Sequence, residues 1–334
     1  MDIPLSKSRS NHRVPIDMSR TGFVHHPAYL KHDTGRFHPE SQDRLLAIEA
    51  RVKKSGIYDQ LVSVDPPSQP RPDLERWIEK VHRSAHVQRI RENIPSTGQT
   101  YLDADTPICP LSYLAAQLAV EGTLVAADKV MSGEIHHAFC ALRPPGHHAE
   151  SNRVMGFCLF NNVAVCARYL QEQHGLKKIA VIDWDVHHGN GTQQIFYEDP
   201  TVLYFSVHQF PLYPGTGAER EVGEGAGEGY TINCPLPPGR GDDPYVGIFE
   251  KILVPSLKSF APDFILISAG FDAHRDDPLA GMQVTEAGFG ELTRIVKNCA
   301  DSLCQGRIVS CLEGGYNLGA LARSVEQHLI VLSS

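Results

Sequence analysis

The chain has 334 residues, of which 42% are hydrophobic and 21% charged, and its formal net charge is −8. This length and composition are typical of an ordinary globular protein with a substantial apolar core. The acidic balance argues against a nucleic-acid-binding surface, which needs clustered Lys and Arg, and it favours a cationic partner. No apolar stretch reaches the ~20 residues of a membrane-spanning helix, so we expect no membrane association.

Eight cysteines are scattered through the chain without a CxxC pair. Several of them lie inside apolar runs such as HHAFCAL and IVSCLEGG, which predicts buried free thiols in a reducing, cytoplasmic environment. We interpret residues 1–20, which are mildly basic but contain Asp2 and Asp17, as a flexible N-terminal arm. Residues 21–334 have no repeat or low-complexity linker, and we expect them to form one domain.

Short apolar runs predict strands, in chain order, at residues 21–26, 136–142, 178–183, 202–208, 263–270 and 307–315. Helical patterns lie between them at residues 112–133, 161–175, 245–260 and 285–306. The strands are apolar throughout instead of alternating, as is typical of strands covered on both faces. The pattern therefore predicts an α/β fold with a single open, mostly parallel sheet and helices on both faces. The Gly-rich stretch VGEGAGEGY lacks the strand-to-helix context of a phosphate loop and predicts a surface turn.

Polar residues follow five of the predicted strands: RPPGHHAE, DWDVHHGNG, SVHQFPLYPGTG, AGFDAHRDDPLAG and EGGYN. In an open parallel sheet, ligands bind outside the carboxyl ends of the strands. We therefore expect these five loops to converge on one rim and to form an active site.

Asp185 and His187 have the i, i+2 spacing that directs two side chains of an extended segment to one side. Asp272, at another strand end, supplies a third ligand, and this donor set predicts a catalytic Zn²⁺ or a similar divalent ion. Asp183 would orient an imidazole or bind a further cation, whereas His188 points away from the site. The alternative is that these carboxylates cap helices or lie in solvated loops, but it does not explain their grouping.

The adjacent His147 and His148 are candidates for proton transfer near neutral pH, although paired histidines also occur without a function. Tyr316 follows two glycines and is a candidate oxyanion donor, with a structural role in a turn as the alternative. Phe157 and Tyr213 lie next to flexible glycines and either line a narrow apolar channel or belong to the core.

The motifs RPPGHHA, GFCLFNN, VIDWDVHHGNGTQ, PGTG, SAGFDAH and EGGYN occur in this order between about residues 140 and 317. Together they resemble the zinc-dependent histone deacetylases of the arginase-deacetylase fold. The Trp in DWDVHHGNG and the Glu in EGGY are more similar to the class II branch and its bacterial relatives. The segment HPESQDR, residues 38–44, extends the resemblance to nearly the whole chain after the first 20 residues.

The resemblance implies a catalytic domain, residues 21–334, that hydrolyses the acetyl or another acyl group from an Nε-acyl-lysine side chain in a protein or peptide. It implies that the zinc ligands are Asp185, His187 and Asp272. His148 would be the main general base and acid with Asn190 beside it, and Asp183 would hold His147 as an electrostatic partner. Tyr316 would polarise the scissile carbonyl group.

The resemblance also implies substrate-binding positions at Gly156, Phe157, Tyr213 and Leu279. Phe157 and Tyr213 would flank the acyl-lysine channel, Gly156 would form its floor, and Leu279 would be an apolar gatekeeper. A structural K⁺ is implied near Asp183 and Ser206.

Three alternatives remain at this point. Hydrolysis of an acetylpolyamine or another small acylated amine fits the acidic net charge, whereas Leu279 favours acyl-lysine because a polyamine-directed relative has a glutamate there. A manganese ureohydrolase shares the fold but lacks the pattern of His147, His148 and Tyr316. A catalytically silent binding module would not need the intact metal and proton-transfer residues. The oligomeric state is left open.

Overall fold

The computed structural model describes residues 20–334, so the predicted arm lies outside the described residues except for Arg20. An eight-stranded sheet has the order β2-β1-β5-β10-β9-β6-β7-β8, and all its neighbouring strands are parallel. Its strands are β1 (Thr21–Val24), β2 (Val62–Val64), β5 (His137–Cys140), β6 (Ile179–Asp183), β7 (Val202–Gln209), β8 (Thr231–Leu236), β9 (Phe264–Ala269) and β10 (Ile308–Leu312). A separate antiparallel pair comprises β3 (Thr100–Tyr101) and β4 (Pro107–Ile108). The predicted parallel sheet is confirmed.

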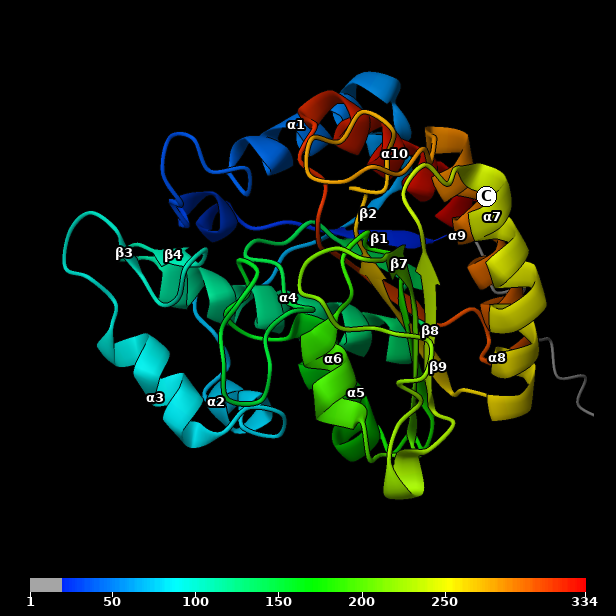
Figure 1. Cartoon of the computed structure of the whole chain (residues 1–334). Helices are drawn as coiled ribbons and strands as arrows, with labels where there is room; N and C mark the ends of the chain where they lie inside the picture. The colour runs from blue at the N-terminus through cyan, green and yellow to red at the C-terminus, as the bar shows by residue number, and fades with distance from the viewer. Residues whose placement is uncertain (1–19) are drawn as a thin grey trace, which may run out of the picture.

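Helices cover both faces of the sheet (Figure 1). They are η1 (Pro27–Lys31), α1 (Asp43–Ser55), η2 (Ile57–Gln60), α2 (Leu74–Ile78), α3 (Ser84–Glu92), α4 (Ser112–Met131), α5 (Asn162–Gln173), α6 (Asn190–Phe196), η3 (Gly225–Gly227), α7 (Asp242–Ile248), η4 (Phe249–Leu253), α8 (Val254–Phe260), α9 (Glu286–Leu303) and α10 (Leu318–Leu332). On one face, His328 of α10 has its ring 5.5 Å from that of Phe139 in β5. On the other, Thr123 of α4 contacts Cys311 of β10 at 3.6 Å. The helices α1 and α7 to α10 share the first face, and α2, α4, α5 and α6 share the second.

Several elements were not predicted from the sequence, among them the long helices α1 and α10. Strands β2 and β8 were not predicted, because both lie at the edges of the sheet, where a strand need not be apolar throughout. Strand β8 even contains Pro235, which is tolerated at an edge. The helix predicted at 245–260 is divided into α7, the π-helical turn η4 and α8. Pro255 has no N–H to donate within a continuous helix, and the wider turn precedes it.

The core is one apolar cluster that extends through both sides of the sheet. All eight cysteines are free and buried, as predicted. Val222–Tyr230 is mostly exposed and contains the short turn η3, in agreement with a surface turn. In the part of the chain that the structure describes, no helix has the length and hydropathy needed to span a bilayer.

Candidate active site and metal centre

The five polar loops follow strands that are neighbours in the sheet. Strands β5, β10, β9, β6 and β7 lie in this order at its centre. Because parallel strands end at the same edge, loops that are distant in sequence lie side by side there.

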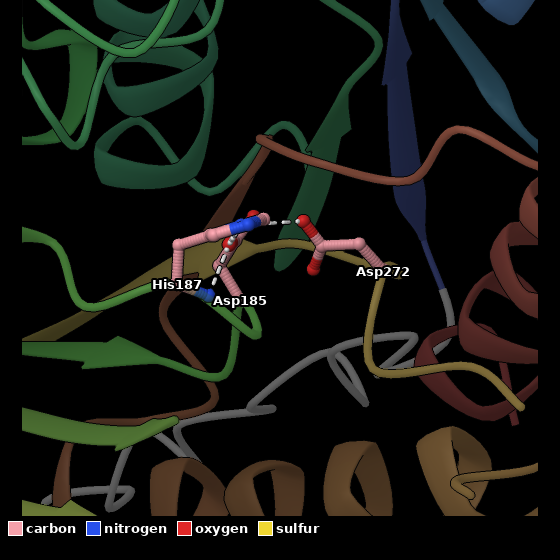
Figure 2. Close-up of side chains that lie close together, drawn as sticks. All are labelled: Asp185, His187 and Asp272. Atoms are coloured by element: carbon pink, nitrogen blue, oxygen red, sulfur yellow. Dashed lines mark hydrogen bonds and ion pairs between the residues drawn. The ribbon is translucent and has the colours of Figure 1, made fainter. Parts of the chain in front are cut away.

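Asp185, His187 and Asp272 form a buried cluster of candidate metal ligands at this edge (Figure 2). One ligand atom from each residue lies within 4.8 Å of the others. The Nδ1 atom of His187 is 3.1 Å from Oδ1 of Asp185 and 3.1 Å from Oδ2 of Asp272. The pairing of β6 with β9 brings Asp272 to the other two residues, which follow β6 directly.

Backbone amides hold both carboxylates in place. Oδ1 of Asp185 accepts a hydrogen bond from the His187 amide at 2.8 Å, and Oδ2 accepts one from the Gly314 amide at 2.7 Å. Oδ1 of Asp272 accepts a hydrogen bond from the Val186 amide at 2.8 Å. These contacts fix one oxygen of each carboxylate toward His187, which is the arrangement that a shared ion requires.

Gly270 and Gly314 have no side chain, and this leaves room for the carboxylates of Asp185 and Asp272. A Cβ atom at Gly270 would lie 2.1 Å from Oδ2 of Asp185, and one at Gly314 would lie 2.0 Å from Oδ2 of Asp272. Gly314 is one of the two glycines that precede Tyr316 in EGGYN. The sequence analysis did not identify Gly270, which lies between the end of β9 and the candidate ligand Asp272.

The charges of the cluster fit a divalent cation. Burial lowers the pKa of His187, but Asp185 and Asp272 more than offset this and raise that pKa to about 10. Burial also raises the pKa of Asp272. Two buried carboxylates therefore need a positive charge between them. Two carboxylate oxygens and one imidazole nitrogen are a donor set that suits Zn²⁺.

His147 lies between the cluster and Asp183. Its Nδ1 atom is 3.0 Å from Oδ2 of Asp183, and its Nε2 atom is 3.8 Å from Oδ1 of Asp185. Burial lowers the pKa of His147, but the two carboxylates outweigh burial and raise it to about 10. Asp183 is thus placed where it can hold His147 as a cation.

His148 has the opposite electrostatic environment. Its Nδ1 atom is 2.8 Å from Oδ1 of Asn190, and its ring centroid is 4.0 Å from that of His147. Burial and the neighbouring His147 and His187 lower the pKa of His148 well below its usual value. Paired groups with pKa values shifted in opposite directions are typical of an acid and a base in one site.

The sequence missed Glu150 as a partner of this pair. The side-chain nitrogen Nδ2 of Asn190 donates a hydrogen bond to Oε1 of Glu150 at 2.8 Å. This contact orients the Asn190 oxygen toward His148, so that Nδ1 of His148 donates its proton and Nε2 is free to accept one. Glu150 could have been noticed in the motif RPPGHHAE, where it follows His148 by two residues.

Aromatic side chains surround the approach to the cluster. The ring of Tyr213 lies 5.2 Å from that of His148 and 6.3 Å from that of His187, and it is 40% exposed. The ring of Phe157 lies 6.0 Å from that of Tyr316. Leu279 is 37% exposed in the loop after β9. Tyr213 therefore borders both the histidines of the site and the surface.

Tyr316 is supported by Arg44, which the sequence left without a role. The guanidinium carbon of Arg44 lies 5.1 Å from the ring centroid of Tyr316. Arg44 Nε also donates a hydrogen bond to the Gly315 carbonyl at 2.7 Å. Burial raises the pKa of the Tyr316 hydroxyl well above its usual value, so the hydroxyl remains a donor at neutral pH.

A buried ion cluster connects the loop of His147 with that of Tyr316. Glu40 lies between Arg44, at 3.1 Å, and Arg143, at 2.5 Å, and all three side chains are fully buried. Glu313 completes the connection, because its Oε2 atom accepts hydrogen bonds from the amides of Gly146 at 2.7 Å and of His147. Sequence reasoning did not find this connection, since its members are distant along the chain.

Two further predicted positions lie beside the centre. Ser206 is the register neighbour of Asp183 in the pair β6–β7, and its hydroxyl forms a 2.8 Å hydrogen bond with Nδ1 of His208. His188 contacts Thr216 at 2.8 Å and Gln193 at 2.9 Å, away from the candidate metal ligands, as the sequence predicts.

Residues 38–332 match the histone deacetylase domain. The chain belongs to the histone deacetylase family. It is therefore a histone deacetylase-family hydrolase, and its fold is the one that the family's motifs predict.

Relatives within this family come from archaea and plants. A probable deacetylase of Archaeoglobus fulgidus is 42% identical over 304 residues, which are 90% of this chain and 83% of the archaeal protein. Histone deacetylase 5 of Arabidopsis thaliana is 40% identical over 324 residues, which are 91% of this chain. Only 48% of that plant protein is covered, so the chain spans about half the length of this relative. The crystal structure of the HDA15 HD domain superposes with a TM-score of 0.88 at 38% identity and covers 94% of this chain and 90% of that chain.

Proposed function

We propose that this histone deacetylase-family protein is a zinc-dependent amidohydrolase that removes the acetyl or another acyl group from Nε-acyl-lysine. The observation that carries the proposal is the buried cluster of Asp185, His187 and Asp272 next to His148. It combines a site for one divalent ion with an imidazole whose pKa is lowered.

The metal would be held by the two carboxylates and by Nδ1 of His187. A bound Zn²⁺ supplies Lewis-acid chemistry, because it lowers the pKa of water and polarises a carbonyl group. The family resemblance also supports a structural K⁺ near Asp183 and Ser206, which we retain as a proposal.

Proton transfer would be carried out by His148. Asn190 accepts the Nδ1 proton, so that Nε2 of the neutral ring can take a proton from water and later return it to the leaving amine. His147, kept positively charged by Asp183, stabilises the negative charge that develops nearby. The hydroxyl of Tyr316 would donate a hydrogen bond to the carbonyl oxygen as that oxygen becomes negative.

The channel residues would select the substrate. Phe157 and Tyr213 would enclose the methylene chain of acyl-lysine above a floor formed by Gly156. Leu279 at the mouth offers an apolar contact and no partner for a distant ammonium group, which supports acyl-lysine over acetylpolyamine.

The test is turnover of three substrates by one zinc-loaded preparation: an acetyl-lysine peptide, N-acetylputrescine and arginine. We expect the peptide to have the highest kcat/KM and a zinc-chelating hydroxamate to inhibit its hydrolysis. A higher kcat/KM for N-acetylputrescine would show that the preferred substrate is an acetylpolyamine and not an acyl-lysine. Turnover of arginine alone, or of no substrate at full zinc occupancy, would overturn the proposal.

A further inference from the structure

Asp277, in the loop after β9, is a buried carboxylate that joins two loops of the site. Its side chain is 7% exposed. Oδ1 accepts a hydrogen bond from the Leu279 amide at 3.0 Å. Oδ2 accepts hydrogen bonds from the amides of Tyr316 at 2.7 Å and Asn317 at 3.3 Å. Three backbone N–H groups from two loops therefore end on one side chain.

The backbone before Tyr316 has little stiffness of its own. Gly314 and Gly315 precede it, and Gly315 has φ +122°, a conformation that glycine adopts without strain. Contacts from outside the loop must therefore fix the direction of the tyrosine. Arg44 binds the Gly315 carbonyl, and Asp277 binds the next amide along the chain. The peptide group that joins Gly315 to Tyr316 is thus held at its carbonyl oxygen by Arg44 and at its N–H by Asp277.

We propose that Asp277 is a positioning residue that acts on the reaction through Tyr316. This inference rests on the proposed function, in which the Tyr316 hydroxyl meets the substrate carbonyl. Within the described residues, the hydrogen bonds of the Asp277 carboxylate are all to backbone amides. A displacement of ~1 Å at a reacting group can cost about 100-fold in rate. Loss of Asp277 is therefore expected to lower kcat without removing zinc.

A double-mutant cycle of Asp277→Ala and Tyr316→Phe separates positioning from a general structural effect. Measured on the acetyl-lysine peptide, Asp277→Ala is expected to lower kcat by about 10- to 100-fold at unchanged zinc content. In the Tyr316→Phe background, the same change is expected to cost less than about threefold, because no hydroxyl is left to misplace. An equal loss in both backgrounds, or wild-type kcat in the single variant, overturns the inference.

Two further variants serve as controls. Asp276→Ala removes the adjacent carboxylate, which is about half exposed and 3.6 Å from Arg323, and it is expected to keep kcat. Asp277→Asn keeps one acceptor oxygen and is expected to recover part of the kcat that Asp277→Ala loses. A thermal unfolding midpoint measured for each variant shows whether it folds. If Asp277→Asn loses as much kcat as Asp277→Ala, both carboxylate oxygens of Asp277 are needed for the positioning. If Asp276→Ala loses as much kcat as Asp277→Ala, the specific role of Asp277 is overturned.

Hydrogen exchange provides a readout that does not need turnover. In the zinc-loaded full chain, Asp277→Ala is expected to speed amide exchange in residues 313–318 by about tenfold, because the acceptor for two of these amides is lost. Asp276→Ala is expected to leave this exchange unchanged. If the wild type hydrolyses no acyl amine, the proposed function fails, but exchange still decides the positioning role. Unchanged exchange in Asp277→Ala overturns that role even in an active enzyme.

Discussion

Gly156 faces the imidazole of His148 so closely that no side chain fits between them. A Cβ atom at Gly156 would lie 2.2 Å from Cδ2 of His148 and 2.6 Å from its Cγ. Gly156 also has φ +56°, which L residues with side chains rarely adopt. The glycine therefore determines where the ring of the proposed general base can lie.

Gly156→Ala is expected to displace His148 and to lower kcat by about 100-fold at unchanged zinc content. The matched control is Gly133→Ala, because Gly133 has φ +75° but no atom within 4 Å of a Cβ at that position. The control shares the backbone strain and lacks the contact with His148. Equal kcat losses in the two variants would contradict the steric role of Gly156.

Asp185→Ala is expected to lose the metal, since it removes one of the three proposed ligands and leaves only His187 and Asp272. Zinc content after dialysis, determined by atomic absorption, measures this directly. We expect less than about a tenth of the wild-type zinc, because loss of a ligand costs metal affinity more than the 10- to 100-fold typical of an outer partner. Full zinc occupancy and activity in this variant would show that the ligand assignment is wrong.

Tyr316→Phe is expected to keep zinc and to lower kcat by about 100- to 1000-fold, the cost of removing one oxyanion donor. Phenylalanine retains the ring that packs between Arg44 and Phe157, so the fold is expected to be unchanged. A thermal unfolding curve and a zinc determination accompany the kinetics. Wild-type kcat would exclude the hydroxyl from the reaction.

Asn190→Ala is expected to lower kcat and to move the acidic limb of the kcat/KM profile to lower pH. The hydrogen bond from Nδ1 of His148 to Asn190 favours the charged imidazole, so its loss lowers the pKa of His148 further. We expect a kcat loss of about 10- to 100-fold from the misoriented ring. A limb that moves to higher pH would contradict this role for Asn190.

Glu40→Gln is expected to destabilise the protein by about 3–5 kcal/mol at pH 7, because it leaves Arg44 and Arg143 without their buried partner. Burial raises the pKa of Glu40, but the two arginines outweigh burial and lower it from 4.5 to about 2. The stability that this ionisation contributes is thus complete above pH 4.5 and is lost as the pH falls toward 2.

Urea unfolding at pH 7 and pH 3 measures the difference between wild type and Glu40→Gln, which is expected to shrink at the lower pH. The surface control is Glu49→Gln, since the pair of Glu49 with Lys53 is exposed and is expected to contribute less than about 1 kcal/mol. A difference that grows as the pH falls would contradict the assigned sign.

Part of the site could be predicted from short stretches of sequence. The spacing of Asp185 and His187 is local, and both lie directly after β6, whose apolar run is evident. The histidine pair and Tyr316 follow strand ends in the same way. What could not be predicted are contacts such as those of Asp277 with the Tyr316 amide and of Glu313 with the Gly146 amide, because these depend on which loops become neighbours.

The sequence by itself determined the parallel α/β architecture, the strands of the sheet's centre and the candidate ligands and bases, because apolar runs and short motifs act over a few residues. Only the tertiary structure decided that β9 lies beside β6 and so places Asp272 3.1 Å from His187. It also decided that Arg44 lies against Tyr316. The physical reason is that strand order and buried ion pairs join residues far apart in the chain, and no local pattern encodes which of them meet.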